Sequence, residues 1–139
     1  MGLKSLFPEE MLENNNSLTL EIIASKMLFY TEQLHLLHFQ TKSYSEHFAL
    51  NIIYNAVGDL KDEVIEKIMG YTGKRIKAYK LEPLKDYTPS LSIQIGKELG
   101  SFAEDLEEFG DTNNMPDIEN IAQGLSGEAA QFLYRLTLT

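Results

Sequence analysis

Apolar side chains recur at steps of three and four residues in four separate stretches of the chain, which is the spacing of one face of an α-helix. These stretches cover about residues 17–40, 43–70, 90–109 and 116–136. No segment shows the alternation of apolar and polar residues that predicts a β-strand. The four apolar stripes consist of Leu20, Ile23, Met27, Tyr30, Leu34 and Leu37; of Ile53, Val57, Leu60, Val64 and Ile68; of Leu91, Ile95, Leu99, Phe102, Leu106 and Phe109; and of Ile118, Ile121, Leu125, Ala129, Phe132 and Leu136.

Residues at the ends of these stretches are typical of helix boundaries. Ser43 and Glu46 predict a capping box, in which the Ser43 hydroxyl accepts the Glu46 N–H and the Glu46 side chain reaches back. Gly70, with Gly73 close behind, is a suitable cap for the end of the second helix. Pro116 suits the first position of the last helix, where a backbone N–H has no helical partner.

The second and third helices are separated by a long connection, residues 71–89, which contains Pro83 and Pro89. We expect this connection to cross the bundle, with or without a short helix of its own. The sequence therefore predicts an all-α fold, a ferritin-like four-helix bundle with one long crossover between helices two and three. Residues 17–139 are expected to form this domain, and residues 1–16 an N-terminal arm.

The composition of the chain restricts its partners. Its 139 residues suit one domain, and its formal net charge of −9 repels the phosphate backbone of nucleic acids. The one basic cluster, Lys74, Arg75, Lys77 and Lys80, is more often a solvated connector than a phosphate site, so DNA binding is not expected. Because the chain has no cysteine and no apolar run of membrane-spanning length, we expect a cytoplasmic protein without membrane contact.

Candidate chemistry gathers on the second helix, where His47, Asn51, Asp62 and Glu66 share one face. This face points away from the apolar stripe of the same helix, so we expect it to meet another subunit. At about 1.5 Å of rise per residue, His47 lies roughly 22 Å from Asp62 and roughly 28 Å from Glu66. One metal ion reaches both ends only where a second copy of the helix packs antiparallel across a two-fold axis. The face therefore predicts an intersubunit metal site.

The ligand types indicate which metal would bind. Imidazole and carboxylate suit Fe, Mn or Zn, and nothing in the set is soft enough to favour copper(I). Either His35 or His38, one turn apart near the end of the first helix, offers a second imidazole. The alternative is an ordinary polar or dimer-forming face, because acid pairs at i, i+4 and histidines at helix starts are also common without metal.

The region of residues 34–70 resembles the Dps mini-ferritin family (DNA-binding proteins from starved cells), and residues 116–136 resemble it more loosely. Family members carry a histidine followed by an aromatic residue late in the first bundle helix, and a second histidine early in the next. An Asp and a Glu four residues apart follow on that helix, and their spacing from the second histidine agrees without a gap. The matching residues here are His38, Phe39, His47, Asp62 and Glu66.

The resemblance implies a function and an assembly. Family members bind Fe(II), oxidise it with hydrogen peroxide or oxygen, and store the ferric mineral inside a shell of twelve subunits. By resemblance, His38, His47 and Asn51 would come from one chain, and Asp62 and Glu66 from its two-fold mate. The resemblance thus implies a homo-oligomeric, iron-binding ferroxidase.

Three features depart from the family pattern. Asn51 replaces an aspartate, the loop from His38 to His47 is shorter, so that His35 has the usual distance to His47, and the basic N-terminal tail is missing. The segment from His38 to His47 also resembles small Dps-like proteins of unassigned role in tailed-phage genomes, which implies the cytoplasm of a bacterium or an infected host cell. A second hypothesis is therefore a ferritin-like structural or interaction protein, oligomeric, with a degenerate metal site.

Overall fold

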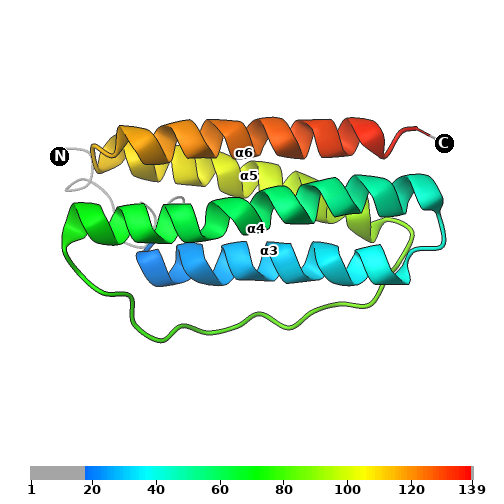
Figure 1. The fold of residues 1–139 in the computed structure, drawn as a ribbon, viewed down its shortest axis with the longest axis horizontal. Helices are drawn as coiled ribbons and strands as arrows, with labels where there is room; N and C mark the ends of the chain where they lie inside the picture. Colours follow the sequence, from blue (N-terminus) through cyan, green and yellow to red (C-terminus); the bar gives the residue numbers. More distant parts are fainter. Residues whose placement is uncertain (1–17, 139) are drawn as a thin grey trace, which may run out of the picture.

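A computed structural model describes residues 18–138, which form four α-helices and no strand. The helices are α3 (Leu20–Gln40), α4 (Tyr44–Thr72), α5 (Leu91–Thr112) and α6 (Pro116–Arg135). Helices α3 and α6 run in one direction along the bundle, and α4 and α5 run in the other (Figure 1). The all-α, four-helix prediction is confirmed for this part of the chain, and the predicted arm, residues 1–16, lies outside it.

The hydrophobic core lies between the four helices and uses the predicted stripes. Helix α3 packs mainly against α4, and α5 against α6, while α4 also contacts α6 and α3 contacts α5 to a smaller extent. Leu34, Val57, Leu99 and Phe132, one from each helix, are completely buried. Removing these side chains from water is the main favourable contribution to folding. No helix of residues 18–138 is long and apolar enough to cross a membrane.

The helix boundaries follow from local chemistry. The Thr19 hydroxyl accepts the Ile22 N–H at 3.2 Å and so caps the start of α3. Helix α4 runs through Gly70, and Gly73 rather than Gly70 is its cap. Gly73 has φ of 69°, the left-handed conformation that glycine adopts at little cost. Pro116 is the first residue of α6, as predicted.

The connection between α4 and α5, residues 73–90, contains no helix and runs along the bundle beside α3 (Figure 1). We call this segment the strap. Polar side chains of α3 hold its backbone at four places along its length. These contacts are Lys77 N–H to Glu21 Oε2 at 2.9 Å, Ser25 Oγ to Lys80 O at 2.5 Å, Gln33 to both backbone groups of Lys85, and Tyr87 N–H to Gln40 Oε1 at 2.8 Å.

The spacing of these contacts shows that the strap is extended. Glu21 and Gln40 are 19 positions apart, or about 28 Å of helix. The strap covers this distance in the ten positions from Lys77 to Tyr87, at about 2.8 Å per position, which approaches the length of an extended chain. An extended segment leaves its own backbone groups without internal partners, and the side chains of α3 supply some of them.

We expect Gln33→Leu to lower the free energy of unfolding by about 1–3 kcal/mol, because it removes two hydrogen bonds between a buried side chain and the strap. Gln33 is completely buried, donates Nε2–H to the Lys85 carbonyl at 2.9 Å, and accepts the Lys85 N–H at 2.8 Å. Urea denaturation measures the effect. The control Asn120→Leu, at an exposed position of α6, should change the same quantity by less than about 0.5 kcal/mol.

Candidate metal centre

The short turn between α3 and α4 brings two of the predicted ligands together. His38 lies in the last turn of α3 and His47 in the first turn of α4, and residues 41–43 join the helices. Their imidazole rings stack, with centroids 3.8 Å apart and planes inclined by 22°. Both side chains are half-buried. The sequence placed these residues near each other but gave no indication of ring stacking.

Each of these two histidines is held by the backbone of the other. His38 Nδ1 lies 3.1 Å from the His47 carbonyl oxygen, and His47 Nδ1 lies 2.9 Å from the His38 carbonyl oxygen. A carbonyl oxygen only accepts, so each Nδ1 carries the hydrogen and donates it. In the neutral rings the lone pair is then on Nε2, the tautomer in which a histidine ligates a metal through Nε2.

Glu46, beside His47, fixes the same turn from the other side. Its backbone N–H donates to Ser43 Oγ at 3.2 Å, which confirms the first half of the predicted capping box. The second half is wrong, because the Glu46 carboxylate does not return to Ser43. It accepts hydrogen bonds from three other hydroxyl groups instead, and these belong to the turn, the strap and α5. They are Thr41 Oγ1 at 2.5 Å, Tyr87 OH at 2.8 Å and Ser92 Oγ at 2.6 Å.

These contacts explain why the carboxylate leaves the cap. Three hydroxyl groups satisfy more of its acceptor capacity than one backbone N–H, and the Thr41 hydroxyl takes the Ser43 N–H at 3.2 Å. The hydrogen bond to Glu46 raises the pKa of Tyr87, because the phenol proton is held by a carboxylate. Glu46 therefore ties the histidine turn to the end of the strap and to the start of α5.

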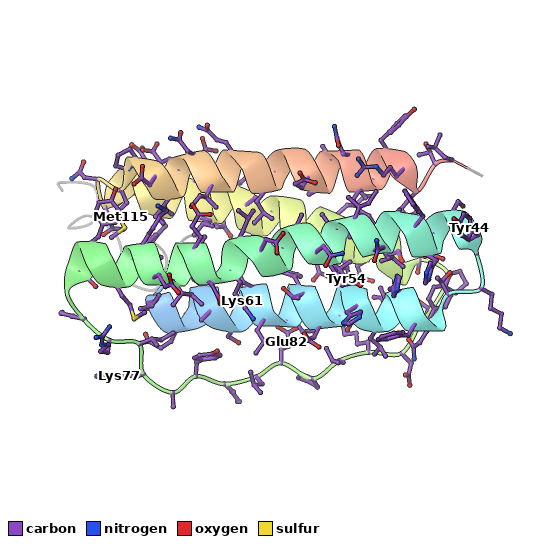
Figure 2. All side chains as sticks on the ribbon, in the orientation of Figure 1. Tyr44, Tyr54, Lys61, Lys77, Glu82 and Met115 are labelled. Carbon is purple, nitrogen blue, oxygen red and sulfur yellow. The ribbon has the colours of Figure 1, made fainter. Side chains whose placement is uncertain are left out.

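His35, the alternative to His38, makes different contacts. Its ring stacks on Tyr54, with centroids 4.2 Å apart and planes inclined by 19°. It also lies 4.5 Å from the ring of Phe39. Figure 2 shows Tyr54 between α3 and α4. Thus His38 faces His47, while His35 faces Tyr54, a residue that the sequence analysis missed although it lies seven positions after His47 on the same face of α4.

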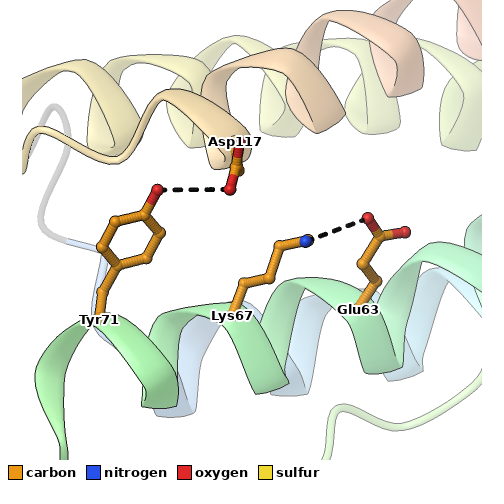
Figure 3. Close-up of polar contacts among 4 residues, drawn as sticks. All are labelled: Glu63, Lys67, Tyr71 and Asp117. Atoms are coloured by element: carbon orange, nitrogen blue, oxygen red, sulfur yellow. Dashed lines mark hydrogen bonds and ion pairs between the residues drawn. The ribbon is translucent and has the colours of Figure 1, made fainter.

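The predicted carboxylate ligands lie further along α4. Asp62 and Glu66 are exposed, and Asn51 is half-buried. Within residues 18–138 the ion pair at 3.7 Å between Lys67 and Glu63 is the only one, so neither Asp62 nor Glu66 pairs with a described cation (Figure 3). Figure 3 also shows Tyr71 directed towards Asp117 of α6, at 3.5 Å. The two acids are therefore available to an external cation.

The single chain does not bring the histidines and the acids together. Helix α4 is continuous from Tyr44 to Thr72, so His47 and Asp62 stay roughly 22 Å apart along its axis. Among residues 18–138 there is no group of three or more histidine, aspartate or glutamate side chains placed to hold a metal ion. A centre that uses both sets requires a second copy of the chain.

A groove in the described part of the chain lies away from these residues. It has a volume of about 660 Å³ between α3 and α5, and none of the three histidines lines it. Tyr30 and Phe102 supply apolar lining, and Lys26 and Asp105 supply charged lining. Burial raises the pKa of the Tyr30 phenol, and nearby carboxylates add to the effect, so this tyrosine is a neutral donor. The groove offers no imidazole to a metal.

Comparisons with known proteins identify related sequences. A family model described as "Family of unknown function (DUF5856)" matches residues 38–136, a range that begins at His38 and contains the predicted ligands except the alternative His35. An uncharacterized 14.6 kDa protein in the mobD-ri intergenic region of Enterobacteria phage T4 is 37% identical over 57 residues. This alignment covers 41% of the present chain and 36% of the phage protein, so the chain matches little more than a third of its relative's length. No solved structure matches the chain.

Proposed function

The chain belongs to the family of unknown function DUF5856, and we propose that within it this protein is a Dps-like mini-ferritin. It would bind Fe(II) at a two-fold contact between subunits, oxidise it and retain the ferric product. The antiparallel four-helix arrangement with one long connection supports a ferritin-like relationship. We further propose that the protein forms homo-oligomers, up to a closed shell of twelve, in the cytoplasm of a bacterium or phage-infected cell. The similarity to a phage T4 protein supports this location.

The reciprocal hydrogen bonds of His38 and His47 carry the proposal. Both Nδ1 atoms are committed to carbonyl oxygens, at 3.1 and 2.9 Å, which leaves both Nε2 atoms as ligands of fixed tautomer. Histidines that ligate metals almost always have this outer hydrogen bond, because it orients the ring and raises its basicity. An ordinary surface histidine needs no such arrangement.

The residues on α4 would complete the site across the two-fold contact. His38 and His47 of one chain would supply imidazole, and Asn51 a neutral amide oxygen. Asp62 and Glu66 of the mate would supply negative charge, which stabilises Fe(III) more than Fe(II) and so favours oxidation. Two Fe(II) ions each release one electron to one molecule of hydrogen peroxide. With two protons the O–O bond breaks and two molecules of water form.

We expect the wild-type protein to give a ferric absorbance band when Fe(II) and hydrogen peroxide are added without oxygen, and to bind Fe(II) stoichiometrically before the oxidant is added. Asn51→Asp should strengthen Fe(II) binding by about tenfold, because ligand charge largely sets the affinity of such sites for hard cations. Isothermal titration measures the dissociation constants.

The control for Asn51→Asp is Asn120→Asp, which adds the same charge at an exposed position of α6. It should leave the dissociation constant for Fe(II) within about twofold of the wild-type value, because exposed charges on separate helices are largely screened. Absence of both Fe(II) binding and the ferric band from the wild-type protein would refute the iron function.

A second function, that of a structural or interaction protein, is favoured by exposed aromatic residues at one end of the bundle. Phe39, Tyr44 and Phe48 are 70%, 80% and 53% exposed. Large apolar groups exposed together are typical of a contact with another protein. On this hypothesis the native mass persists after thorough chelation and no Fe, Mn or Zn copurifies. Stoichiometric metal by elemental analysis would argue strongly against it.

A further inference from the structure

The strap has a charge opposite to that of the molecule as a whole. Residues 73–90 contain five of the twelve lysine and arginine residues and only two carboxylates, whereas the whole chain has a net charge of −9. Four of the five cations lie within seven residues, and all four are exposed. We call Lys74, Arg75, Lys77 and Lys80 the basic segment.

The way in which the strap is bound leaves these cations free. The hydrogen bonds from α3 to the basic segment go to backbone groups, Lys77 N–H and Lys80 O, and not to the side-chain charges of this segment. None of the four cations forms an ion pair with a carboxylate of residues 18–138. Figure 2 shows Lys77 on the strap, outside the four-helix core. A row of exposed cations without an ion pair among residues 18–138 is available to another molecule.

The same chain carries an acidic surface on α5. This helix contains six carboxylates and one lysine. We call Glu98, Glu104, Asp105, Glu108 and Asp111 the acidic ridge. Burial is the largest cause that raises the pKa of Asp105; the neighbouring Glu108 and Glu104 add to the effect, and Lys26 opposes it. No ridge residue forms an ion pair with a described cation.

The two surfaces match in length as well as in charge. The acidic ridge extends over 13 positions of helix, or about 20 Å. The basic segment extends over six positions at the strap's about 2.8 Å per residue, or about 17 Å. Copies of a protein with a net charge of −9 repel each other in most orientations. Contact between opposite charges is the orientation in which this repulsion becomes attraction.

We propose that the basic segment of one copy docks on the acidic ridge of α5 of a second copy. The contact joins two different surfaces, so it is heterologous and propagates around a ring or along an array. It involves neither α4 nor the histidines and does not depend on the proposed iron site. Combined with a two-fold contact through α4, it would connect dimers into a larger assembly.

The contact predicts that self-association depends on salt. In sedimentation velocity experiments the metal-free wild-type protein should form a larger species at about 0.01 M salt. This species should dissociate at about 1 M salt, because the Debye length falls from about 30 Å to about 3 Å. Lys74→Glu/Lys80→Glu and Glu104→Lys/Glu108→Lys should each weaken association at low salt at least tenfold. Lys42→Glu, at an exposed lysine of the α3–α4 turn, is the control and should keep the wild-type response.

Mixing the two charge-reversed proteins provides the decisive measurement. The acidic strap of one now complements the basic ridge of the other, so the mixture should recover the larger species that neither forms alone. This recovery also shows that both variants are folded. A native mass independent of salt, or a mixture that stays dissociated, would overturn the proposal. So would binding of single-stranded DNA that depends on the basic segment while the native mass does not change with salt.

Discussion

Proteins with His47→Ala and with Glu66→Ala should each bind less than about a tenth as much Fe(II) as the wild type, yet a mixture of the two should regain about a quarter of the wild-type sites. The reason is the length of α4, which keeps the histidine and the acid of one chain at opposite ends of the helix. A two-fold dimer then contains two sites, each built from one His47 and the mate's Glu66. A mixed dimer has one site that lacks both residues and one site that lacks neither.

The quarter follows from random exchange of subunits. Half of the dimers are mixed, and half of the sites in each mixed dimer are intact. Anaerobic Fe(II) titration of the separate proteins, and of the mixture after unfolding and refolding together, measures the number of sites. The matched control is the double variant His47→Ala/Glu66→Ala mixed with wild type. Each mixed dimer then has two damaged sites, so refolding together should halve the number of sites that the wild-type subunits alone provide. No recovery above the separate proteins would exclude a site shared across the two-fold contact.

Phe132→Ala should lower the free energy of unfolding by about 3–5 kcal/mol, the largest effect on stability that we expect from a single substitution. Phe132 is completely buried in α6. Helix α5 presents Gly96 to this ring, and a Cβ added at Gly96 would lie 3.0 Å from Phe132 Cδ2. Since glycine has no side chain to move into the space, the cavity left by the truncated ring stays unfilled. Urea denaturation at fixed protein concentration measures the loss.

The close approach of the two helices is tested by a second substitution. Gly96→Ala alone should be destabilising, because its Cβ would lie 2.8 Å from Leu133 Cδ2 and 3.0 Å from Phe132 Cδ2. In the Phe132→Ala protein, Gly96→Ala should lower the free energy of unfolding by less, because the contact with the Phe132 ring is gone. The control is Phe39→Ala, which removes a side chain that is 70% exposed and should lower the free energy of unfolding by less than about 0.5 kcal/mol. Additive effects of Gly96→Ala and Phe132→Ala would contradict the packing described here.

Much of the fold could be predicted because it depends on local signals. The apolar stripes, the cap at Ser43 and the position of Pro116 identified the helices to within a few residues. The course of the strap was less predictable, because an extended segment has no hydrophobic period of its own. One signal was present: Gln33 lies within the apolar stripe of α3, and a polar side chain there requires a partner. The identity of that partner depends on packing between distant segments.

The candidate site was predictable in part for the same reason. Helical periodicity placed His47 and the two acids on α4, and helix length required a second copy of the chain. The stacking of His38 on His47 and their exchange of hydrogen bonds depend on the geometry of the turn at residues 41–43, which spacing does not reveal. The Glu46 carboxylate binds Tyr87 and Ser92 instead of completing the capping box, and these two residues lie more than 40 positions away in the sequence.

The hydrogen bonds between α3 and the strap determine which amino-acid substitutions the strap tolerates. At Lys77, Lys80, Lys85 and Tyr87 the helix contacts backbone groups, which every amino acid except proline offers equally. The outward side chains between these points are therefore open to substitution at little cost to folding. Substitutions in the strap would therefore change which molecules the protein binds, while the four-helix bundle keeps its structure.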